Sequence, residues 1–271
     1  MRVVVLDVAT NHTLMRIVFC ILTLSIALTS FGQGDKPVTR QLPIMVALGQ
    51  SDVAIDELSR HIERMSRVKS KSKTDSALVA VVFHKTQSRF LHSYKQYARF
   101  DELFDTETYN CLTATTLFAC IYQSLGFEVD IFETRFHSFL MVQTTSGGIL
   151  LETTDRVNGI VTGSEKISER IQTYLEKEVE QLNEPSSIPL DSYVPIREIS
   201  FHQLIGLHYL NRAVVNINNS NINRAAAELS KAEAYYPESD RISDLYYVII
   251  TQCDASPMNG TAITTEDLTE N

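Results

Sequence analysis

The sequence has no tryptophan, a minority of basic residues and no cysteine–histidine cluster with the spacing of a metal site. Without tryptophan, stacking against a substrate must use tyrosine or phenylalanine. The 24 basic residues are outnumbered by 33 acidic ones, and the net charge of −9 argues against a nucleic-acid-binding surface. The one basic cluster, Arg67 to Lys73, is typical of a solvated helix end or loop. We therefore predict no metal, no cofactor and no nucleic-acid partner.

The N-terminal apolar run, Ile17 to Ala27, is too short for a comfortable membrane span. It follows Met15 and precedes the small residues Ser30 and Gly32, which suit signal cleavage before Gln33. We therefore predict a signal peptide over residues 1–32, with Met15 as an alternative start and an unusually long leader or an uncleaved anchor as further alternatives. The prediction implies a bacterial protein that is exported, periplasmic or secreted, with no stable membrane insertion after cleavage.

Removing the signal leaves an odd number of cysteines, which are Cys111, Cys120 and Cys253. In an exported protein at least one of these thiols is then unpaired unless two chains cross-link. A disulfide between Cys120 and Cys253 is conceivable, although their spacing predicts nothing. An unpaired thiol fits a nucleophile.

The thiol of Cys111 is expected at the start of a buried helix. Asn110 is a good N-cap, so Cys111 falls in the first turn, where unpaired backbone N–H groups and the helix dipole favour a thiolate. Apolar residues continue at helical spacing to Leu125, and Gly126 supplies a stop. Cys120 lies about half a turn away from Cys111 around the helix, so the two thiols do not share a face.

Three predicted strands follow, at 127–132, 136–143 and 149–153. The second begins near His137 and is apolar on both faces, which is typical of a central strand. The short turn before the third strand makes the pair antiparallel and brings an acid beside His137. Which acid faces the imidazole depends on the register, which the sequence leaves open. Glu152 is favoured because it lies inside the apolar run, and Asp155, at its end, is the alternative.

This order of residues resembles the transglutaminase-like superfamily, whose members share a papain-like core of cysteine, histidine and an acid. The matching segments are Tyr109–Cys111, His137 with its apolar strand, and Leu151–Thr154; the stretch Phe90–Phe104 adds to the likeness. The resemblance covers about residues 80–240 and is greatest to a bacterial branch that carries tetratricopeptide-like helices. It implies an α+β fold in which helices pack on an antiparallel sheet. Ser138 stands where the family commonly has an aromatic residue.

The resemblance also implies a mechanism. Cys111 attacks an acyl carbon as a thiolate, His137 holds the ion pair and later protonates the leaving group, and Glu152 fixes the imidazole tautomer. The backbone N–H of Cys111 is the natural oxyanion donor, with the Asn110 side chain as a possible second one. The expected function is cleavage or transfer at amide bonds of a protein or peptide substrate. The alternative is an inactive scaffold that binds a protein partner.

At 271 residues, 44% of them hydrophobic, the chain can bury one good core and a smaller appended unit. We predict a core over 33–183, a proline-containing linker over 184–198, helices over 199–252 and a disordered tail over 253–271. Within the core, helices are expected at 53–68, 75–98 and 165–182. Seven residues stand where a tetratricopeptide repeat has its characteristic residue types: Tyr209, Asn211, Ala213, Ala225, Leu229, Ala232 and Pro237. These helices are expected to pack on the core or to bind a protein partner.

Overall fold

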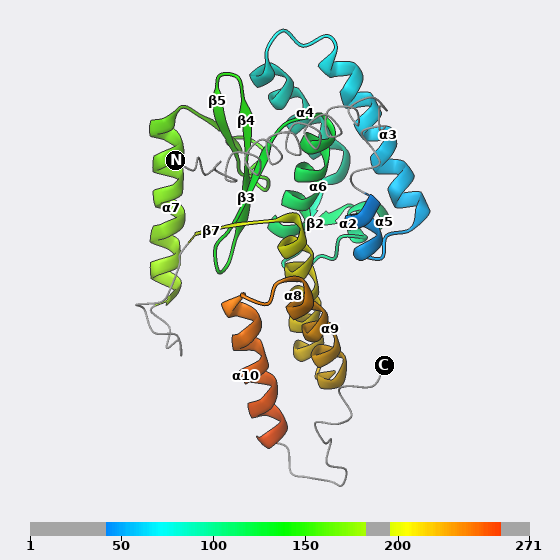
Figure 1. Ribbon diagram of the computed structural model, residues 1–271, viewed down its shortest axis with the longest axis vertical. Coiled ribbons are helices and arrows are strands. Elements are labelled where there is room, and N and C mark those ends of the chain that lie inside the picture. The colour runs from blue at the N-terminus through cyan, green and yellow to red at the C-terminus, as the bar shows by residue number, and fades with distance from the viewer. Residues whose placement is uncertain (1–41, 183–195, 256–271) are drawn as a thin grey trace, which may run out of the picture. The chain divides into compact units, whose positions relative to one another are not determined.

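The computed structural model describes residues 42–182 and 196–255, which form a mixed α+β fold (Figure 1). The predicted signal peptide at 1–32 and the tail beyond residue 255 lie outside the described residues, as does most of the predicted linker. Among the helices that are described, none combines the length and the apolar character needed to cross a membrane.

Three helices open the described part of the chain, and hydroxyl side chains cap the second and the third. These are α2 (Leu42–Ala47), α3 (Asp52–Lys69) and α4 (Asp75–Phe90). The side chain of Ser51 accepts from the Ala54 N–H, and that of Thr74 accepts from the Ala77 N–H. The helix predicted at 75–98 therefore starts as expected, but it ends at Phe90.

A short parallel strand pair replaces the last turns of that predicted helix. The elements here are β1 (Ser93–Tyr94), α5 (Glu102–Asp105) and β2 (Thr108–Tyr109). The backbone N–H groups of His92 and Ser93 both donate to the carbonyl of Glu107, so the chain gives up helical bonds for contacts with a later segment. This turn away from the helix brings the 95–101 loop against the start of the next helix.

Helix α6 (Cys111–Ser124) is the buried centre of the fold. Asn110 and Thr113 form a reciprocal capping box at its start, and Gly126 adopts a φ of 84° beyond its end. Every residue from Leu112 to Tyr122 is buried. The start and the end that the sequence predicts for this helix are confirmed.

A five-stranded antiparallel sheet lies against α6, in the order β6-β5-β4-β3-β7. Its strands are β3 (Val129–Glu133), β4 (Ser138–Thr144), β5 (Gly147–Leu151), β6 (Ile160–Thr162) and β7 (Arg197–Ile199). The three predicted strands are present with shifted ends, and β4 lies at the centre as predicted. Strand β7, which the sequence does not predict, lies at the end of the predicted 184–198 linker and pairs with β3.

The sheet is covered on both faces, which explains the apolar character of both sides of β4. Helix α6 packs on the face that carries Leu140 and Val142. Helix α7 (Ser164–Leu182) covers the other face, where Tyr174 packs with Phe139 and Leu150 (Figure 1). The sheet is therefore the middle layer between these two helices.

The C-terminal helices share the core of the sheet and do not form a separate unit. They are α8 (Phe201–Asn218), α9 (Ile222–Tyr235) and α10 (Asp240–Ala255), so α10 extends into the predicted tail. Ser200 and Gln203 form a capping box at the start of α8. Buried side chains of α8 and α9 belong to the same apolar cluster as those of α6, and the described residues cluster into one compact unit. The buried Glu133 of β3 also accepts from Tyr236 just after α9.

Two buried histidines join helices of this core. The Nε2 atom of His61 lies 3.0 Å from Thr86 Oγ1, and that of His208 lies 2.8 Å from Thr116 Oγ1. Burial, helped by nearby cations, lowers the pKa of His61 to about 4 and that of His208 to about 3. Both imidazoles are therefore neutral in the folded protein at neutral pH.

We expect these histidines to make the protein sensitive to mild acid. Above pH 6.5, about the pKa of an unfolded histidine, both imidazoles are neutral in the folded and in the unfolded chain. Below that pH only the unfolded chain binds protons at these two residues, so the free energy of unfolding decreases as the pH is lowered. At pH 5 the loss is roughly 2 kcal/mol for each histidine. Urea unfolding at pH 7 and pH 5 measures it, and a His61→Gln/His208→Gln variant should lose most of the difference. An unchanged difference in that variant would contradict the assignment.

Candidate active site

Cys111 is the first residue of α6, and Asn110 holds it there. The side-chain oxygen of Asn110 accepts from the Thr113 N–H at 2.9 Å, and its Nδ2 donates to the carbonyls of Gln96 at 2.9 Å and Ala98 at 3.1 Å. Both amide hydrogens are thus committed to the 95–101 loop. In this structure the Asn110 side chain is a buried cap and has no amide hydrogen left for the suggested role of oxyanion donor.

His137 immediately precedes β4, where a turn fixes its backbone. The Oγ1 atom of Thr134 accepts from the His137 N–H at 3.0 Å, and the Thr134 N–H donates to the His137 carbonyl at 2.8 Å. The strand register aligns Leu140 with Leu151, which continues to a pairing of Phe139 with Glu152. Because His137 and Phe139 are two residues apart, Glu152 lies on the face of the sheet that carries the imidazole.

Glu152 is the acid that meets this imidazole. Its Oε2 atom lies 2.6 Å from His137 Nε2 and 2.7 Å from the Tyr174 hydroxyl, while Oε1 accepts from the N–H and the hydroxyl of Thr154. Asp155, the alternative acid, accepts instead from two backbone N–H groups of its own turn, at residues 157 and 158. The register that the sequence leaves open is thus resolved in favour of Glu152.

A close backbone approach holds Glu152 in this position. Its N–H donates to the Gly159 carbonyl at 2.8 Å, just beyond the last paired residues of β5 and β6. A Cβ atom at Gly159 would lie 2.4 Å from the Glu152 carbonyl oxygen and 2.6 Å from the Phe83 ring. Only glycine fits there without a shift of the backbone.

The three groups shift one another's ionisation toward an ion pair. Burial opposes charge on Glu152, but the hydrogen bonds and the charge of His137 outweigh it and lower the glutamate pKa to about 2. Burial likewise lowers the pKa of His137, and its hydrogen bonds with Cys111 and Glu152 reverse this and raise the pKa to about 10. Burial raises the pKa of Cys111, but the contact with His137 brings it below its usual value.

Ser138 adds a further contact with the thiol. Both its backbone N–H and its hydroxyl lower the pKa of Cys111, and the hydroxyl is buried without another hydrogen-bond partner among the described residues. The Ser138 carbonyl accepts from Thr115, one helical turn after Cys111 on α6. Since Glu152 occupies Nε2 of His137, Nδ1 is the ring nitrogen left for the thiol.

Cys120 has the opposite environment. It is fully buried, and burial raises its pKa to about 12. The side chain of Cys253 lies outside the described residues. Within residues 42–182 and 196–255, no group of three or more histidine, cysteine or acidic side chains is placed to hold a metal ion.

Tyr174 is the polar contact of the site that the sequence does not identify. Its ring packs at 5.3 Å from the His137 ring, and its hydroxyl donates to the same Glu152 oxygen that meets the imidazole. Helical spacing on α7 predicts an inward residue at Tyr174 or Leu175, which is the only signal for it. The phenol therefore binds one carboxylate oxygen of Glu152 while Thr154 binds the other.

Two cavities among the described residues bear on the site, and His137, Glu152 and Tyr174 line only one of them. A cavity of about 570 Å³ is bounded by His137, Glu152 and Tyr174, together with Phe136 and part of α7. A larger cavity of about 810 Å³ lies between the end of α2, the 95–102 segment and helices α8 and α9. Neither Cys111 nor His137 lines the larger cavity, whereas His137 but not Cys111 lines the smaller one.

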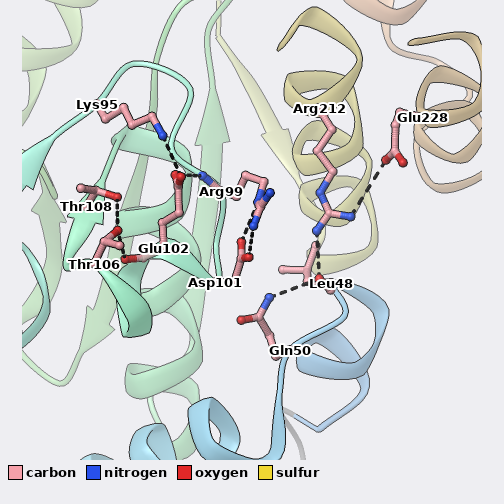
Figure 2. Close-up of polar contacts among 10 residues, drawn as sticks. All are labelled: Leu48, Gln50, Lys95, Arg99, Asp101, Glu102, Thr106, Thr108, Arg212 and Glu228. Atoms are coloured by element: carbon pink, nitrogen blue, oxygen red, sulfur yellow. Dashed lines mark hydrogen bonds and ion pairs between the residues drawn. The ribbon is translucent and has the colours of Figure 1, made fainter. Parts of the chain in front are cut away.

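Figure 2 shows the polar contacts around the larger cavity. Lys95 pairs with Glu102 at 2.7 Å, and Arg99 pairs with Asp101. Arg212 donates to the carbonyl of Leu48 at 2.9 Å and lies 4.0 Å from a Glu228 oxygen. The first two pairs lie within the 95–102 segment, which also holds Asn110, whereas Arg212 joins α8 to the end of α2 and to α9. The larger cavity thus borders the segment that holds the cap of the Cys111 helix.

Comparison with known proteins identifies no relative, since no family model, curated protein or solved structure matches the chain. The chemical interpretation of the site therefore depends on the geometry of this structure alone. A half-buried thiol with a lowered pKa, a hydrogen-bonded imidazole and an orienting carboxylate make an arrangement suited to nucleophilic attack on an acyl carbon.

Proposed function

We propose that the protein is an exported, transglutaminase-like cysteine enzyme that cleaves or transfers acyl groups at amide bonds of peptides or proteins. The observation that carries the proposal is the contact of one imidazole, that of His137, with both the Cys111 thiol and the Glu152 carboxylate. A buried histidine alone would be ordinary, as His61 and His208 illustrate. The Nε2 atoms of those two imidazoles lie beside threonine hydroxyls and their pKa values are lowered, whereas the pKa of His137 is raised.

The reaction divides into two steps. The Cys111 thiolate attacks the carbonyl carbon, the carbon–nitrogen bond breaks, and the imidazolium of His137 gives its proton to the departing amine. A thioester remains on Cys111. Water or a second amine then attacks the thioester while His137 takes the proton of the incoming group, which returns the free thiolate and releases an acid or a new amide.

The backbone supports the developing oxyanion. Cys111 is the first residue of α6, where N–H groups have no acceptor within the helix. Its own N–H is therefore the oxyanion donor, and the helix dipole adds to the stabilisation. The Asn110 side chain takes no part, because the loop carbonyls use both of its amide hydrogens.

Selective alkylation of the thiols tests this proposal. At pH 6 iodoacetamide should label Cys111 faster than an unactivated thiol by about 100-fold, because the ion pair keeps Cys111 charged at a pH where an ordinary thiol is protonated. Cys120 should react only after unfolding, since it is fully buried. Peptide mass spectrometry at timed intervals gives each rate in the same sample, with Cys253 as an internal reference.

A different result would favour the alternative function, an inactive scaffold that binds a protein partner. If folded protein labels Cys111 no faster than a free cysteine and forms no thioester with activated esters, the enzyme proposal fails. The cavity between α8, α9 and the 95–102 segment would then be the leading candidate for binding a protein partner. In that case Cys111→Ala should leave the biological effect intact.

A further inference from the structure

The oxyanion of the proposed reaction has one donor on helix α6, which is the N–H of Cys111. Sites that stabilise an oxyanion usually direct more than one donor at it. The Asn110 side chain is not the second donor, because loop carbonyls use both of its amide hydrogens. The imidazole of His137 and the hydroxyl of Ser138 both contact the thiol itself. A second donor therefore has to come from another segment of the chain.

The strand pair β1 and β2 places Tyr94 beside the start of helix α6. Tyr94 pairs with Tyr109 in this parallel ladder, and the Lys95 N–H donates to the Tyr109 carbonyl at 2.8 Å. The two tyrosine rings meet edge to face, with their centroids 5.8 Å apart. Tyr109 is two residues before Cys111, which is at most about 7 Å of chain, and neighbouring strands lie about 5 Å apart. The phenol of Tyr94 is therefore within side-chain reach of the thiol.

The charges that act on Tyr94 indicate where its hydroxyl lies. Burial is the first cause that raises the pKa of this phenol, and the next causes are the charges of Cys111, Tyr109 and Glu152. Because the interaction of two charges weakens with distance, the hydroxyl lies close to the thiol and its carboxylate. The pKa of Tyr109 responds instead to burial and to Arg156. Of the two phenols, that of Tyr94 is the one directed at the site.

The hydroxyl of Tyr94 is available to a substrate. It has no hydrogen-bond partner within residues 42–182 and 196–255, and the residue is 58% exposed. The thiol of Cys111 is itself half-buried, so a carbonyl that approaches from solvent can reach both groups. The raised pKa keeps the phenol protonated at neutral pH, so it can donate to an oxygen that gains negative charge.

We propose that Tyr94 is a catalytic residue whose hydroxyl donates a hydrogen bond to the oxyanion, together with the N–H of Cys111. The inference rests on the proposed function and adds a residue to it. When the sulfur bonds to the carbonyl carbon, the π electrons of the carbonyl move to its oxygen, and the two donors bind this anion. When the intermediate collapses, the electron pair re-forms the carbonyl and the amine leaves with the proton of His137. The phenol keeps its own proton throughout.

Comparison of acylation with alkylation tests the proposal in the full-length protein. Acylation of Cys111 by p-nitrophenyl acetate passes through an oxyanion, whereas alkylation by iodoacetamide displaces iodide at a saturated carbon and forms none. Tyr94→Phe should lower the rate of p-nitrophenol release in the first turnover by about tenfold and leave the alkylation rate at pH 6 within about twofold of the wild type. An unchanged alkylation rate also shows that the variant keeps its fold and its ion pair.

A thionoester gives a second readout that a structural role would not change. In the thionoester analogue of p-nitrophenyl acetate, sulfur replaces the carbonyl oxygen, and sulfur is the weaker hydrogen-bond acceptor. Relative to free cysteine, the wild type should prefer the oxygen ester, and Tyr94→Phe should lose about tenfold of this preference. Tyr109→Phe is the matched control, since it removes the adjacent hydroxyl and keeps the ring that packs on Tyr94. Its rates with both esters should stay within about twofold of the wild type.

The outcomes separate this inference from the proposed function. If the wild type forms no thioester at Cys111, the enzyme proposal fails and the role of Tyr94 fails with it. If Tyr94→Phe forms the thioester at the wild-type rate, the enzyme stands and Tyr94 is not an oxyanion donor. Equal slowing of acylation and alkylation in Tyr94→Phe would assign the effect to the thiolate, and an equal loss in Tyr109→Phe would assign it to packing. Either result would overturn the inference.

Discussion

Replacing His137 by alanine should reduce the rate at which iodoacetamide alkylates Cys111 at pH 6 by about 100-fold. Without the imidazole the thiol loses the contact that offsets its burial, so its pKa returns to its usual range or above. A thiol with a pKa near 8.5 is ionised to less than about 1% at pH 6. Stopped-flow or timed mass spectrometry of the labelled peptide measures the rate.

The pH dependence distinguishes a lost ion pair from a damaged fold. Below its thiol pKa, His137→Ala should react about tenfold faster for each unit of pH, whereas the wild type should rise less steeply. A His208→Ala variant is the matched control, since it removes another buried imidazole that packs against the same helix. Labelling of Cys111 that is equally slow in both variants would point to a general loss of packing and contradict the ion pair.

Replacing Glu152 by glutamine should reduce turnover of an amide or activated ester by about 100-fold. The substitution keeps the size of the side chain but removes the charge that raises the pKa of His137 and allows an amide hydrogen to face Nε2. The imidazolium then loses its stabilising partner. An NMR titration of the His137 ring should show a pKa well below the value of about 10 in the wild type.

Asp155, the acid three residues after Glu152, supplies the control for this experiment. Asp155→Asn keeps an oxygen that can accept from the two N–H groups of its turn, so the loop should be unchanged. Its turnover should stay within about twofold of the wild type, because it does not contact His137. Comparable losses in Glu152→Gln and Asp155→Asn would contradict the assignment of Glu152 as the orienting acid.

Much of the fold follows from local patterns. The apolar period predicts a helix over 53–68, and α3 runs from Asp52 to Lys69. Local patterns do not predict a strand whose pairing partner is distant in the sequence. Strand β7 has only three residues beside a proline-containing stretch, and it exists because β3 offers it a free edge. The predicted extension of α4 to residue 98 failed for the same reason, since the bonds that end it reach to Glu107.

The site could be predicted as far as its residue types and their order. The cap at Asn110 and the position of Cys111 follow from helix rules, and the antiparallel return of β5 brings Glu152 near His137. Its register could not be fixed, because that depends on which residues of two apolar strands align. The contacts of Asn110 with the 95–101 loop and of Tyr174 with Glu152 join distant segments, so no local period reveals them.

Strand β7 has a consequence for how the chain can be divided. A fragment ending after Leu182 would keep the thiol, the imidazole and the carboxylate, yet it would leave one edge of β3 without its neighbour. It would also strip His208 from Thr116 on the helix that begins with Cys111. The residues of the proposed site therefore do not form an independent folding unit. The C-terminal helices belong to the same unit as Cys111.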